Sequence, residues 1–520
     1  MILIKGIKIG LHEEESSLLD KACRKYRIDR KDVLSWKIRR RSLDARKEIA
    51  FVYSLVMEVK NEAKYLQKEG IILYEEKDLS VTPVDSSLRP VIIGYGPSGI
   101  FAAWRLLEAG VRPVIFERGK RVSKREKDVE NYFSKGLFLP ESNVVYGEGG
   151  AGTFSDAKLT TRLNDPFIDY ILDVFVKHGA SEDIRIDAHA HIGTDVVRKV
   201  IEKITDDLIE RGAEFHFEER VTDFLIEEGT VKGIKTDKGE YACSHVLLGI
   251  GHSAFDTFKA LYERGVFLEA KDAAVGFRVE HPQSLIDRIQ YHGIVSEKLD
   301  PSEYFLRYKG EKGVYSFCMC PGGFVVPSNA EEGSVVTNGM SYHDRGNHLA
   351  NSALLIQVKK EEYGEGPLAG FDYLRAIERK AYELSGSYKA VSMNLSDYVD
   401  HELHELRFPS SYPLGTITAD IHSLFSEKDN EILEDALQYF NSQIPGFLEE
   451  GILAGPETRS SSPVRILRDE SGQSVNTKGL YPMGEGPGYG GGIMSCALDG
   501  IRTADRVLRS LANSSKVHIR

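Results

Sequence analysis

The sequence predicts an α/β fold that is built on a parallel sheet. A mixed α/β segment interrupts this fold, and a small α+β unit precedes it. Three observations support the prediction. A strand, a glycine-rich turn, a helix and a second strand follow one another over residues 91–117. A further strand–turn–helix unit begins at Gly479, near the end of the chain. The first 87 residues have their own strands and helices, and a polar, proline-bearing stretch, Lys77–Pro90, closes them off.

The composition is that of a soluble globular protein. The chain has 520 residues, 41% of them hydrophobic and 28% charged, which suggests two to four structural units. A net charge of −12 disfavours a nucleic-acid surface. Five scattered cysteines without zinc spacing predict a reducing compartment. The acidic start is unlike a signal peptide, and no apolar run reaches ~18 residues. We expect a cytoplasmic protein with no metal, nucleic-acid partner or membrane span, and leave the oligomeric state open.

The N-terminal unit, residues 1–87, has the order β-α-β-β-α. Hydrophobic periodicity places strands at Ile2–Leu11, Asp32–Ile38 and Ile49–Val59, and helices at Ser16–Tyr26 and Asn61–Glu69. Lys77–Pro90 reads as a linker. We expect a separate α+β sandwich.

The rest of the chain is predicted as one α/β domain with an insertion. Helices are expected at Gly99–Ala109, Asp165–His178, Gly193–Arg211, Phe371–Leu384, Asn430–Phe440 and Gly492–Leu511, and strands at Val91–Gly94, Val111–Glu117, Phe215–Ile226, Thr230–Thr236 and Tyr241–Ile250. This pattern assigns 88–270 and 451–520 to the parallel-sheet domain and 271–450 to a mixed β and α substrate, or cap, domain.

The strongest motif is VIIGYGPSGIFAAWRL at residues 91–106, in which Gly94, Gly96 and Gly99 have G-x-G-x-x-G spacing. The first glycine permits a tight turn, the second lets a pyrophosphate approach, and the third lets helix and strand pack. The helix N-terminus favours the phosphates. Glu117, which ends the next strand, can accept both ribose hydroxyls of an adenosine and disfavours a 2′-phosphate. This is a Rossmann-like unit, and it does not by itself separate FAD from NAD.

Two further glycine-rich segments favour FAD. Gly479–Ile493 (GLYPMGEGPGYGGGI) is a short strand, a glycine turn and a helix start, and the positive helix end suits a flavin ring that gains negative charge on reduction. Gly147–Lys158 (GEGGAGTFSDAK) offers flexible backbone together with Thr153, Ser155 and Lys158 for a loop along the phosphates or the flavin edge; a plain glycine turn is the alternative.

In combination with GHSAFDT, AVGFRVEHPQ, FCMCPGGFVVPS, TNGMSYHDRGN and ETRSSSPVRI, these motifs resemble the glutathione-reductase-type FAD superfamily. Within it, the chain is similar to bacterial uncharacterised FAD-dependent, or NAD(FAD)-utilising, dehydrogenases along nearly its whole length. The resemblance implies FAD but no particular substrate. Glu485 departs from the superfamily, in which many members carry an Asp that contacts the ribityl or the phosphate.

The expected cofactor residues follow from the motifs and the resemblance. They are Gly94, Gly96, Pro97, Ser98, Gly99, Glu117, Arg118, Arg125, Gly149, Gly150, Ala151, Gly152, Thr153, Ser155, Lys158, Val221, Gly251, Gly484, Glu485, Gly491, Gly492 and Ile493.

Four residues are candidates for the reacting face. Cys318 and Cys320 would share one face of a strand, as a redox pair or a thiolate, or as plain core residues. In an extended strand their side chains lie ~6.5–7 Å apart, so at most one reactive thiol and no bridge is expected. Arg459 could bind an anionic substrate or the flavin, or lie in a turn. His252 is either a group beside the cofactor or a turn residue.

The leading hypothesis is an FAD-dependent oxidoreductase that passes hydride between a small-molecule substrate and the flavin. No second strand–G-x-G-x-x-G–helix unit of the kind at residues 91–117 is visible, so NAD(P)H would dock transiently or a protein redox partner would supply electrons. The alternatives are a non-catalytic or regulatory flavoprotein and a tRNA-modifying flavoenzyme; the negative charge counts against the latter.

Overall fold

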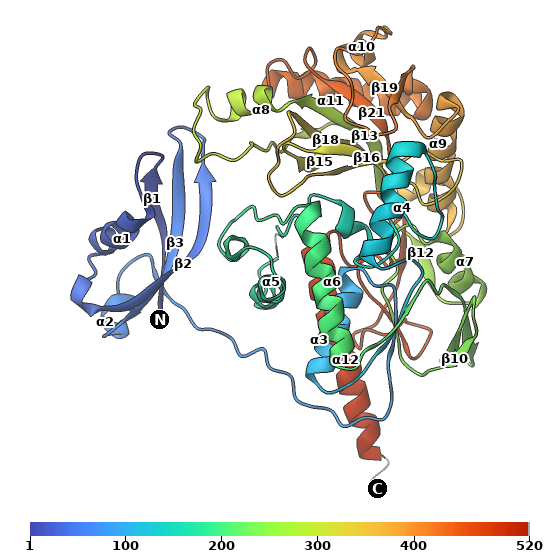
Figure 1. Cartoon of the computed structure of the whole chain (residues 1–520), viewed down its shortest axis with the longest axis horizontal. Helices are drawn as coiled ribbons and strands as arrows, with labels where there is room; N and C mark the ends of the chain where they lie inside the picture. The colour runs from blue at the N-terminus through green and yellow to red at the C-terminus, as the bar shows by residue number, and fades with distance from the viewer. Residues whose placement is uncertain (162, 518–520) are drawn as a thin grey trace.

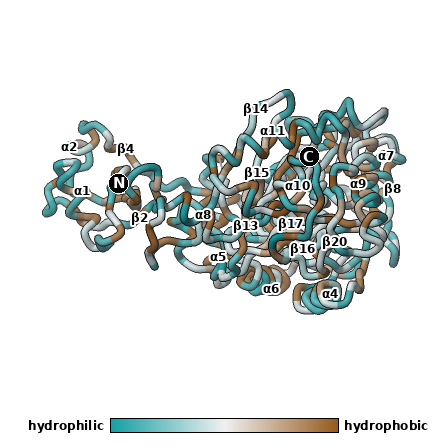
Figure 2. Tube along the Cα trace, turned by 90° about the horizontal axis from the view of Figure 1, so that it is seen from above, coloured by the Kyte–Doolittle hydropathy of each residue, from teal (hydrophilic) through white to brown (hydrophobic). Residues whose placement is uncertain are grey.

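Three bodies make up the chain in the structure, a computed structural model that describes residues 1–161 and 163–517, without the side chains of 514–517. In Figure 1 the N-terminal unit lies to the left, a lobe with a parallel sheet lies below, and a cap with a large mixed sheet lies above it. Hydrophobic segments gather inside the two larger bodies (Figure 2). No helix in the described part of the chain is long and apolar enough to cross a membrane.

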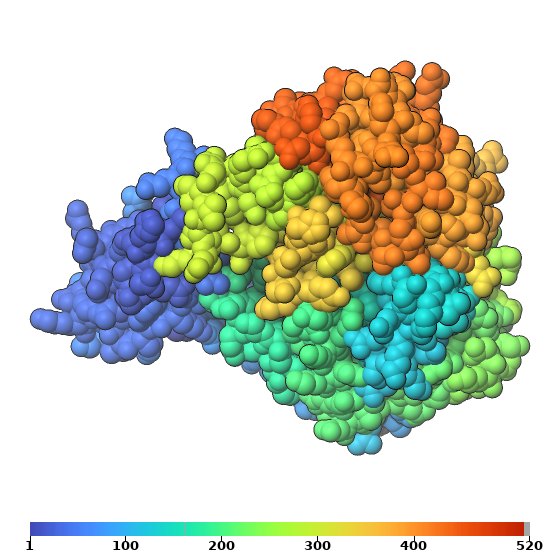
Figure 3. Space-filling model, turned by 45° about the horizontal axis from the view of Figure 1, so that its top comes forward, coloured from blue at the N-terminus to red at the C-terminus, as the bar shows by residue number. Residues whose placement is uncertain are grey.

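The N-terminal unit is an antiparallel sheet in the order β2-β3-β1-β4 with its own hydrophobic core. Its elements are β1 (Ile2–Gly10), α1 (Leu18–Tyr26), β2 (Val33–Asp44), β3 (Ala50–Val59), α2 (Glu62–Leu66) and β4 (Ile71–Leu73). The predicted elements are present, and the short strand β4 is an addition. The unit contacts both lobes. Arg41 in β2 exchanges backbone hydrogen bonds with Ile186 and Ala188 of the lower lobe, and His292 of the cap reaches the Ala45 carbonyl. Figure 3 shows the N-terminal unit, in blue, against the rest of the molecule.

The predicted linker is less free than its composition suggests. Val81 and Val84 pack against the core of the lower lobe, and Val84 N–H donates to the Ala109 carbonyl at 2.9 Å. Arg105 donates to the Leu79 carbonyl at 2.7 Å. The predicted linker Lys77–Pro90 therefore packs in part against the surface of the lower lobe.

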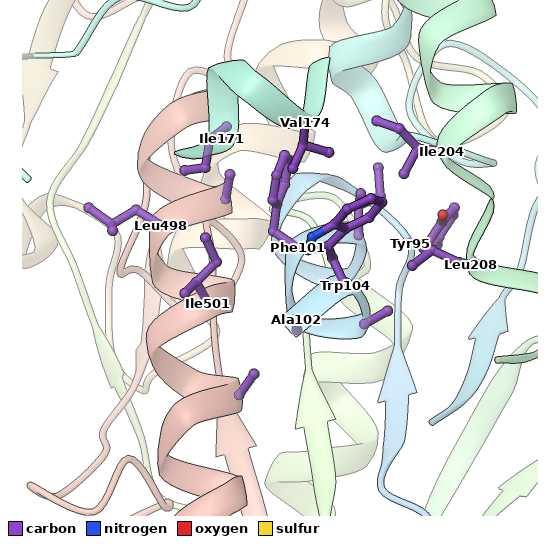
Figure 4. Close-up of a cluster of buried hydrophobic side chains, with 14 of the residues drawn as sticks. Tyr95, Phe101, Ala102, Trp104, Ile171, Val174, Ile204, Leu208, Leu498 and Ile501 are labelled. Carbon is purple, nitrogen blue, oxygen red and sulfur yellow. The ribbon is translucent and has the colours of Figure 1, made fainter. Parts of the chain in front are cut away.

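The lower lobe has a five-stranded parallel sheet in the order β23-β11-β5-β6-β7, which confirms the α/β prediction. Its strands are β5 (Val91–Ile93), β6 (Val114–Glu117), β7 (Glu214–Phe217), β11 (Val246–Leu248) and β23 (Leu480–Pro482). Its helices are α3 (Pro97–Glu108), α4 (Val122–Lys135), α5 (Phe167–Lys177), α6 (Thr194–Glu210), α7 (Phe255–Glu263) and α12 (Ile493–Val517). Helices α3, α5 and α12 pack together on one face through residues such as Phe101, Ile171 and Ile501 (Figure 4).

Two predicted strands are each divided in the structure. Phe215–Ile226 is broken by Glu218, whose φ is +56°, into β7 of the parallel sheet and β8 (Val221–Glu227) of another. Tyr241–Ile250 likewise becomes β10 (Glu240–Ala242) and β11. Strands β8, β9 (Thr230–Thr236) and β10 form a separate antiparallel sheet. Each predicted strand has apolar residues on both sides of its break, so the sequence pattern does not show that the chain passes from one sheet to another there.

The cap is a seven-stranded sheet in the order β14-β15-β18-β13-β21-β19-β20 with helices around it. Its strands are β13 (Ala273–Pro282), β14 (Arg307–Lys309), β15 (Gly313–Cys320), β18 (Leu349–Val358), β19 (Ala390–Asn394), β20 (Thr416–Thr418) and β21 (Ile452–Glu457), beside a hairpin of β16 (Phe324–Pro327) and β17 (Thr337–Met340). Its helices are α8 (Gln283–Gln290), α9 (Ala369–Ser385), α10 (Leu395–Asp400) and α11 (Glu427–Gln443).

The predicted cap boundary at residue 451 falls too early. Strand β21 follows it, yet β21 pairs antiparallel with β13 and β19 inside the cap sheet. The chain enters and leaves the cap through one antiparallel pair, β12 (Leu268–Ala270) and β22 (Val464–Ile466).

Candidate functional site

The turn between β5 and α3 uses its three glycines for different reasons. Gly94 has φ +90°, and an added Cβ would lie 2.5 Å from the Gly249 carbonyl oxygen. At Gly99 an added Cβ would lie 2.2 Å from the Gly94 carbonyl oxygen. At Gly96 the nearest atom would be 3.9 Å away. Chain packing therefore requires the first and third glycines, whereas the second keeps free space open in front of the N-terminus of α3.

Glu117 is held by the backbone around this turn. Its side chain is buried, and it accepts hydrogen bonds from the N–H groups of Tyr95 and Gly119 at 2.9 Å and of Gly147 at 3.0 Å. A carboxylate has about four acceptor positions. About one remains for a ligand, so the geometry leaves room for a hydrogen bond to one hydroxyl group rather than the expected two.

A cavity of about 270 Å³ runs from this turn to the cap. Most of the predicted cofactor residues line it: Gly94, Gly96, Pro97, Ser98, Glu117, Arg118, Gly150, Ala151, Gly152, Ser155, Lys158, Val221, Gly251, Glu485, Gly492 and Ile493. Of the predicted reacting residues, Cys318, Arg459 and His252 also line it. Four segments far apart in the sequence thus meet around one space.

Six predicted cofactor residues do not line the cavity: Gly99, Arg125, Gly149, Thr153, Gly484 and the exposed Gly491. Arg125 is fully buried and donates to the carbonyls of Asn143, Val144, Glu148 and Gly150, so it shapes the loop from behind. Burial lowers its pKa to about 9. The Thr153 hydroxyl donates to the Glu148 carbonyl, and the N–H of Gly484 donates to Asp499. These groups support the wall and do not form it.

At the Glu117 end of the cavity, the wall includes the positive charge of Arg118, which two carboxylates already balance. The Arg118 guanidinium lies 4.2 Å from the centre of the Tyr146 ring and pairs with Glu141 and Asp256. Val221, the first residue of β8, is buried beside it. A flat, largely apolar ligand group fits this end better than a further anion.

Arg459 and His252 have weaker claims to chemistry than their sequence positions suggest. Arg459 donates to both carboxylate oxygens of Glu378 at 2.8 and 2.7 Å in a buried pair, so its charge is matched. Burial, with the Arg459 charge nearby, lowers the pKa of His252 to about 3. His252 is therefore neutral at physiological pH and a poor proton acceptor.

The cap end of the cavity contains a buried ion pair that the sequence did not single out. Arg278 of β13 pairs with Glu457 of β21 and also donates to Asn338 at 2.9 Å. Burial raises the pKa of Glu457 to about 7, against the pull of Arg278. Glu457 and Asn338 line the cavity. Both ion-pair residues fall within motifs already quoted, AVGFRVEHPQ and ETRSSSPVRI, but only the pairing of β13 with β21 brings them together.

Lys158 lies at the same end. It donates to the Met319 carbonyl and lies 3.2 Å from Glu303. Burial opposes its charge, but Glu303 and Asp156 outweigh this and raise the pKa of Lys158. Asp156, which the sequence analysis did not single out, also lines the cavity.

The premise used for the two cysteines was wrong, because β15 is not regular there. Phe317 pairs with Ala353 of β18 and Cys320 with Asn351, so β15 has one residue more than its partner, a β-bulge. Cys318 has φ +45°. Cys318 lines the cavity, whereas Cys320 is fully buried behind it. The prediction that both face the reacting site is corrected to Cys318 alone.

Two clusters in the cap bring three potential metal ligands within 4.8 Å of one another: His401, His422 and Glu434, and Asp397, Glu402 and His404. Each contains ion pairs; His401 and His422 both contact Glu434, at 3.3 and 3.4 Å. Neither cluster lines the cofactor cavity.

Comparison with known proteins identifies the cofactor. A family model described as FAD-dependent protein, C-terminal domain-like, matches residues 272–460, and a domain of unknown function matches residues 1–59. The open space at Gly96, the acid at Glu117 and the second glycine-rich wall fit a dinucleotide. FAD is the cofactor of this protein.

One curated relative covers almost the whole chain. An uncharacterized protein of Clostridium beijerinckii is 38% identical over 531 residues, which is 98% of this chain and 98% of the relative. Among solved structures, a geranylgeranyl bacteriochlorophyll reductase-like protein of Thermoplasma acidophilum is 12% identical, with 82% and 79% of the two chains covered and a TM-score of 0.36. The glycerol-3-phosphate dehydrogenase of Bacillus halodurans is 11% identical, with 84% and 66% covered and a TM-score of 0.35. Scores this low do not establish a shared fold.

Proposed function

The chain belongs to the same family as the uncharacterized Clostridium beijerinckii protein, and from this premise we propose that it is an FAD-dependent oxidoreductase. When bound, FAD supplies hydride transfer to or from a substrate. The observation that supports the proposal best is the single cavity: a backbone-lined end suited to a dinucleotide leads to an end with a thiol, an amine and a carboxyl group.

The lining divides into a binding part and a reacting part in this proposal. The N-terminus of α3, with Gly96, faces the pyrophosphate, and Glu117 accepts a ribose hydroxyl. The N-terminus of α12, with Gly492, faces the flavin end. Cys318, Lys158 and Glu457 face the substrate, and the cap excludes water from it.

The electron donor is part of the proposal. Within residues 1–161 and 163–517 there is one fully parallel sheet, and the dinucleotide-type turn between β5 and α3 belongs to it. We expect NAD(P)H to dock transiently against the flavin, or a redox protein to supply electrons. A small-molecule substrate and a cytoplasmic location belong to the same proposal.

A regulatory flavoprotein is the second candidate. The N-terminal unit favours it, because this unit has its own core and contacts both lobes without lining the cavity. In this role, the N-terminal unit would respond to the conformation of the lower lobe and the cap, and a partner protein would bind to the unit.

The test is to release the bound flavin from purified protein by denaturation and to identify it by chromatography. We expect FAD and not FMN, because Glu117 is placed for an adenosine ribose. Anaerobic mixing with NADH and NADPH then measures flavin bleaching. Finding FMN, or no flavin after reconstitution, would contradict the proposal. FAD that no donor reduces and no substrate reoxidises would favour the regulatory candidate.

A further inference from the structure

The bulge at the end of β15 brings the Cys320 thiol against the backbone of Cys318. In a regular strand, side chains two residues apart lie ~6.5–7 Å apart along one face. Here one extra residue and the left-handed backbone at Cys318 break that spacing. The Cys320 thiol forms a hydrogen bond with the Cys318 side chain, and it also donates to the Cys318 carbonyl at 3.3 Å. The sequence analysis expected no disulfide because it assumed an extended strand, and the bulge removes that assumption.

Two cations lie beside this thiol pair. Arg278 donates to the Cys318 carbonyl at 2.8 Å, and Lys158 donates to the carbonyl of Met319, the residue between the two cysteines. The hydrogen bond from Cys320 lowers the pKa of Cys318, and the positive charges of Arg278 and Lys158 add to this effect. The same hydrogen bond, with burial, raises the pKa of Cys320. When one of the two sulfurs is ionised, these interactions favour the thiolate on Cys318 and the thiol on Cys320.

The two sulfur atoms have unequal access to the cavity. Cys318 lines the cofactor cavity, whereas Cys320 is fully buried behind it. Phe317, the neighbouring residue, also lines the cavity and is 41% exposed, so solvent reaches the wall beside Cys318. The sulfur of Cys318 can therefore react with the cofactor or a substrate, and the sulfur of Cys320 can then form a disulfide with it.

We propose that Cys318 and Cys320 form a dithiol–disulfide pair that exchanges two electrons with the bound FAD, which makes a small disulfide the substrate class. The proposal rests on the proposed function, since it needs the FAD. When the pair is oxidised, the Cys320 S–H bond breaks, one S–S bond forms between Cys320 and the Cys318 thiolate, and the two electrons and the one proton reduce the cofactor. In the opposite direction the reduced cofactor returns them and the disulfide opens.

The reaction with substrate is thiol–disulfide exchange. The Cys318 thiolate attacks one sulfur of the substrate, the substrate S–S bond breaks, and one thiol leaves. The sulfur of Cys320 then attacks that of Cys318, the mixed disulfide breaks, and the second thiol leaves. Reduced FAD, replenished by the nicotinamide or redox protein proposed above, reopens the Cys318–Cys320 disulfide.

The experiment is an anaerobic reductive titration of the full-length protein loaded with FAD and first oxidised with hydroxyethyl disulfide. Dithionite is added in small steps, flavin absorbance is followed, and thiols are counted after denaturation. We expect the wild type to take up twice as many electrons as its FAD content alone requires. Cys318→Ser should halve that uptake, whereas Cys320→Ser, which has no sulfur to resolve it, should retain a mixed disulfide between Cys318 and mercaptoethanol that intact-protein mass measurement detects. Cys243→Ser, a half-buried thiol outside the cavity lining, should match the wild type.

Two outcomes separate the hypotheses. If the oxidised wild type still has five free thiols and takes up only the electrons that its FAD requires, the dithiol proposal is wrong and the FAD-dependent function stands. If the protein binds no FAD, the proposed function fails, while a peptide two mass units lighter that contains both cysteines would still demonstrate the pair. The wild-type stoichiometry decides even if a serine variant does not fold.

Discussion

The Glu117 end of the cavity is built around a glycine turn, with the Arg118 and Tyr146 side chains beside it, whereas the Cys318 end is built from side chains on several strands. The first end comes from adjacent pieces of chain, the β5–α3 turn and the end of β6. The second end comes from three cap strands, β15, β17 and β21, and from the loop that carries Lys158. A cofactor site made of backbone depends on a few glycines at fixed spacing, whereas a reacting site made of side chains depends on how distant strands pair.

The largest expected effect is at the backbone end. Gly96→Val should abolish FAD retention, because its side chain would fill the space that no protein atom occupies within 3.9 Å. The chain should still fold, since nothing packs there. Flavin content per folded protein is the measurement. Gly313→Val is the control, because an added Cβ there meets no atom within 4 Å and the residue lies outside the cavity lining. Normal flavin content in Gly96→Val would remove this turn as the phosphate site.

The side-chain end should respond in stability first. Arg278→Met leaves Glu457 buried without its partner, which typically costs about 3–5 kcal/mol. We expect a lower unfolding temperature, measured calorimetrically, with FAD retained at 25 °C. Adding Glu457→Met should restore part of the loss, because an uncharged pair removes the buried charge. Arg46→Met, in an exposed pair with Asp44, should change little. Loss of FAD in Arg278→Met would mean that the two ends are not separable.

This difference explains how much of the molecule could be predicted. The roles of Gly94, Gly96 and Glu117 follow from local spacing, and the strand–turn–helix signal is equally local. Cys318 and Cys320 were placed on a regular strand because a bulge is visible only against the partner strand β18. Glu457 and Arg278 lie 179 residues apart, so their pairing is a property of the sheet. Arg125 was expected to bind the cofactor, because the sequence does not show that its guanidinium donates to loop carbonyls such as those of Asn143 and Gly150.

A truncation tests whether the N-terminal unit contributes to either end of the cavity. Deleting residues 1–76 should leave a soluble, yellow protein, because no residue of that segment lines the cavity. Residues 77–87 should be kept, since Val81 and Val84 pack on the core. The lost backbone bond from Ala188 to Arg41 should speed hydrogen exchange at Ala188. A colourless truncation would show that the unit completes the cofactor site.

The smallest effect concerns pH. Burial raises the pKa of Glu485 from 4.5 to about 7, although Lys271 opposes it. In apo-protein the folded state therefore holds a proton that the unfolded chain releases, so stability falls as the pH rises from about 4.5 to 7. Glu485→Gln should flatten this part of the stability curve, measured as unfolding temperature against pH. The exposed Glu470→Gln should leave the slope unchanged. An unchanged slope in Glu485→Gln would mean that the carboxyl titrates normally.

The short pair β12–β22 has an evolutionary consequence. The chain enters the cap at Ala270 and leaves it at Val464, and these two residues are direct partners in one antiparallel ladder. An insertion whose ends meet in this way can be exchanged as a module, because the host lobe needs only to close one short gap. A descendant protein in which another cap replaces this one could act on different substrates. It would keep the residues that bind the phosphates of FAD. Diversification in this family should therefore be fastest between residues 271 and 463, and relatives that handle different substrates should differ there first.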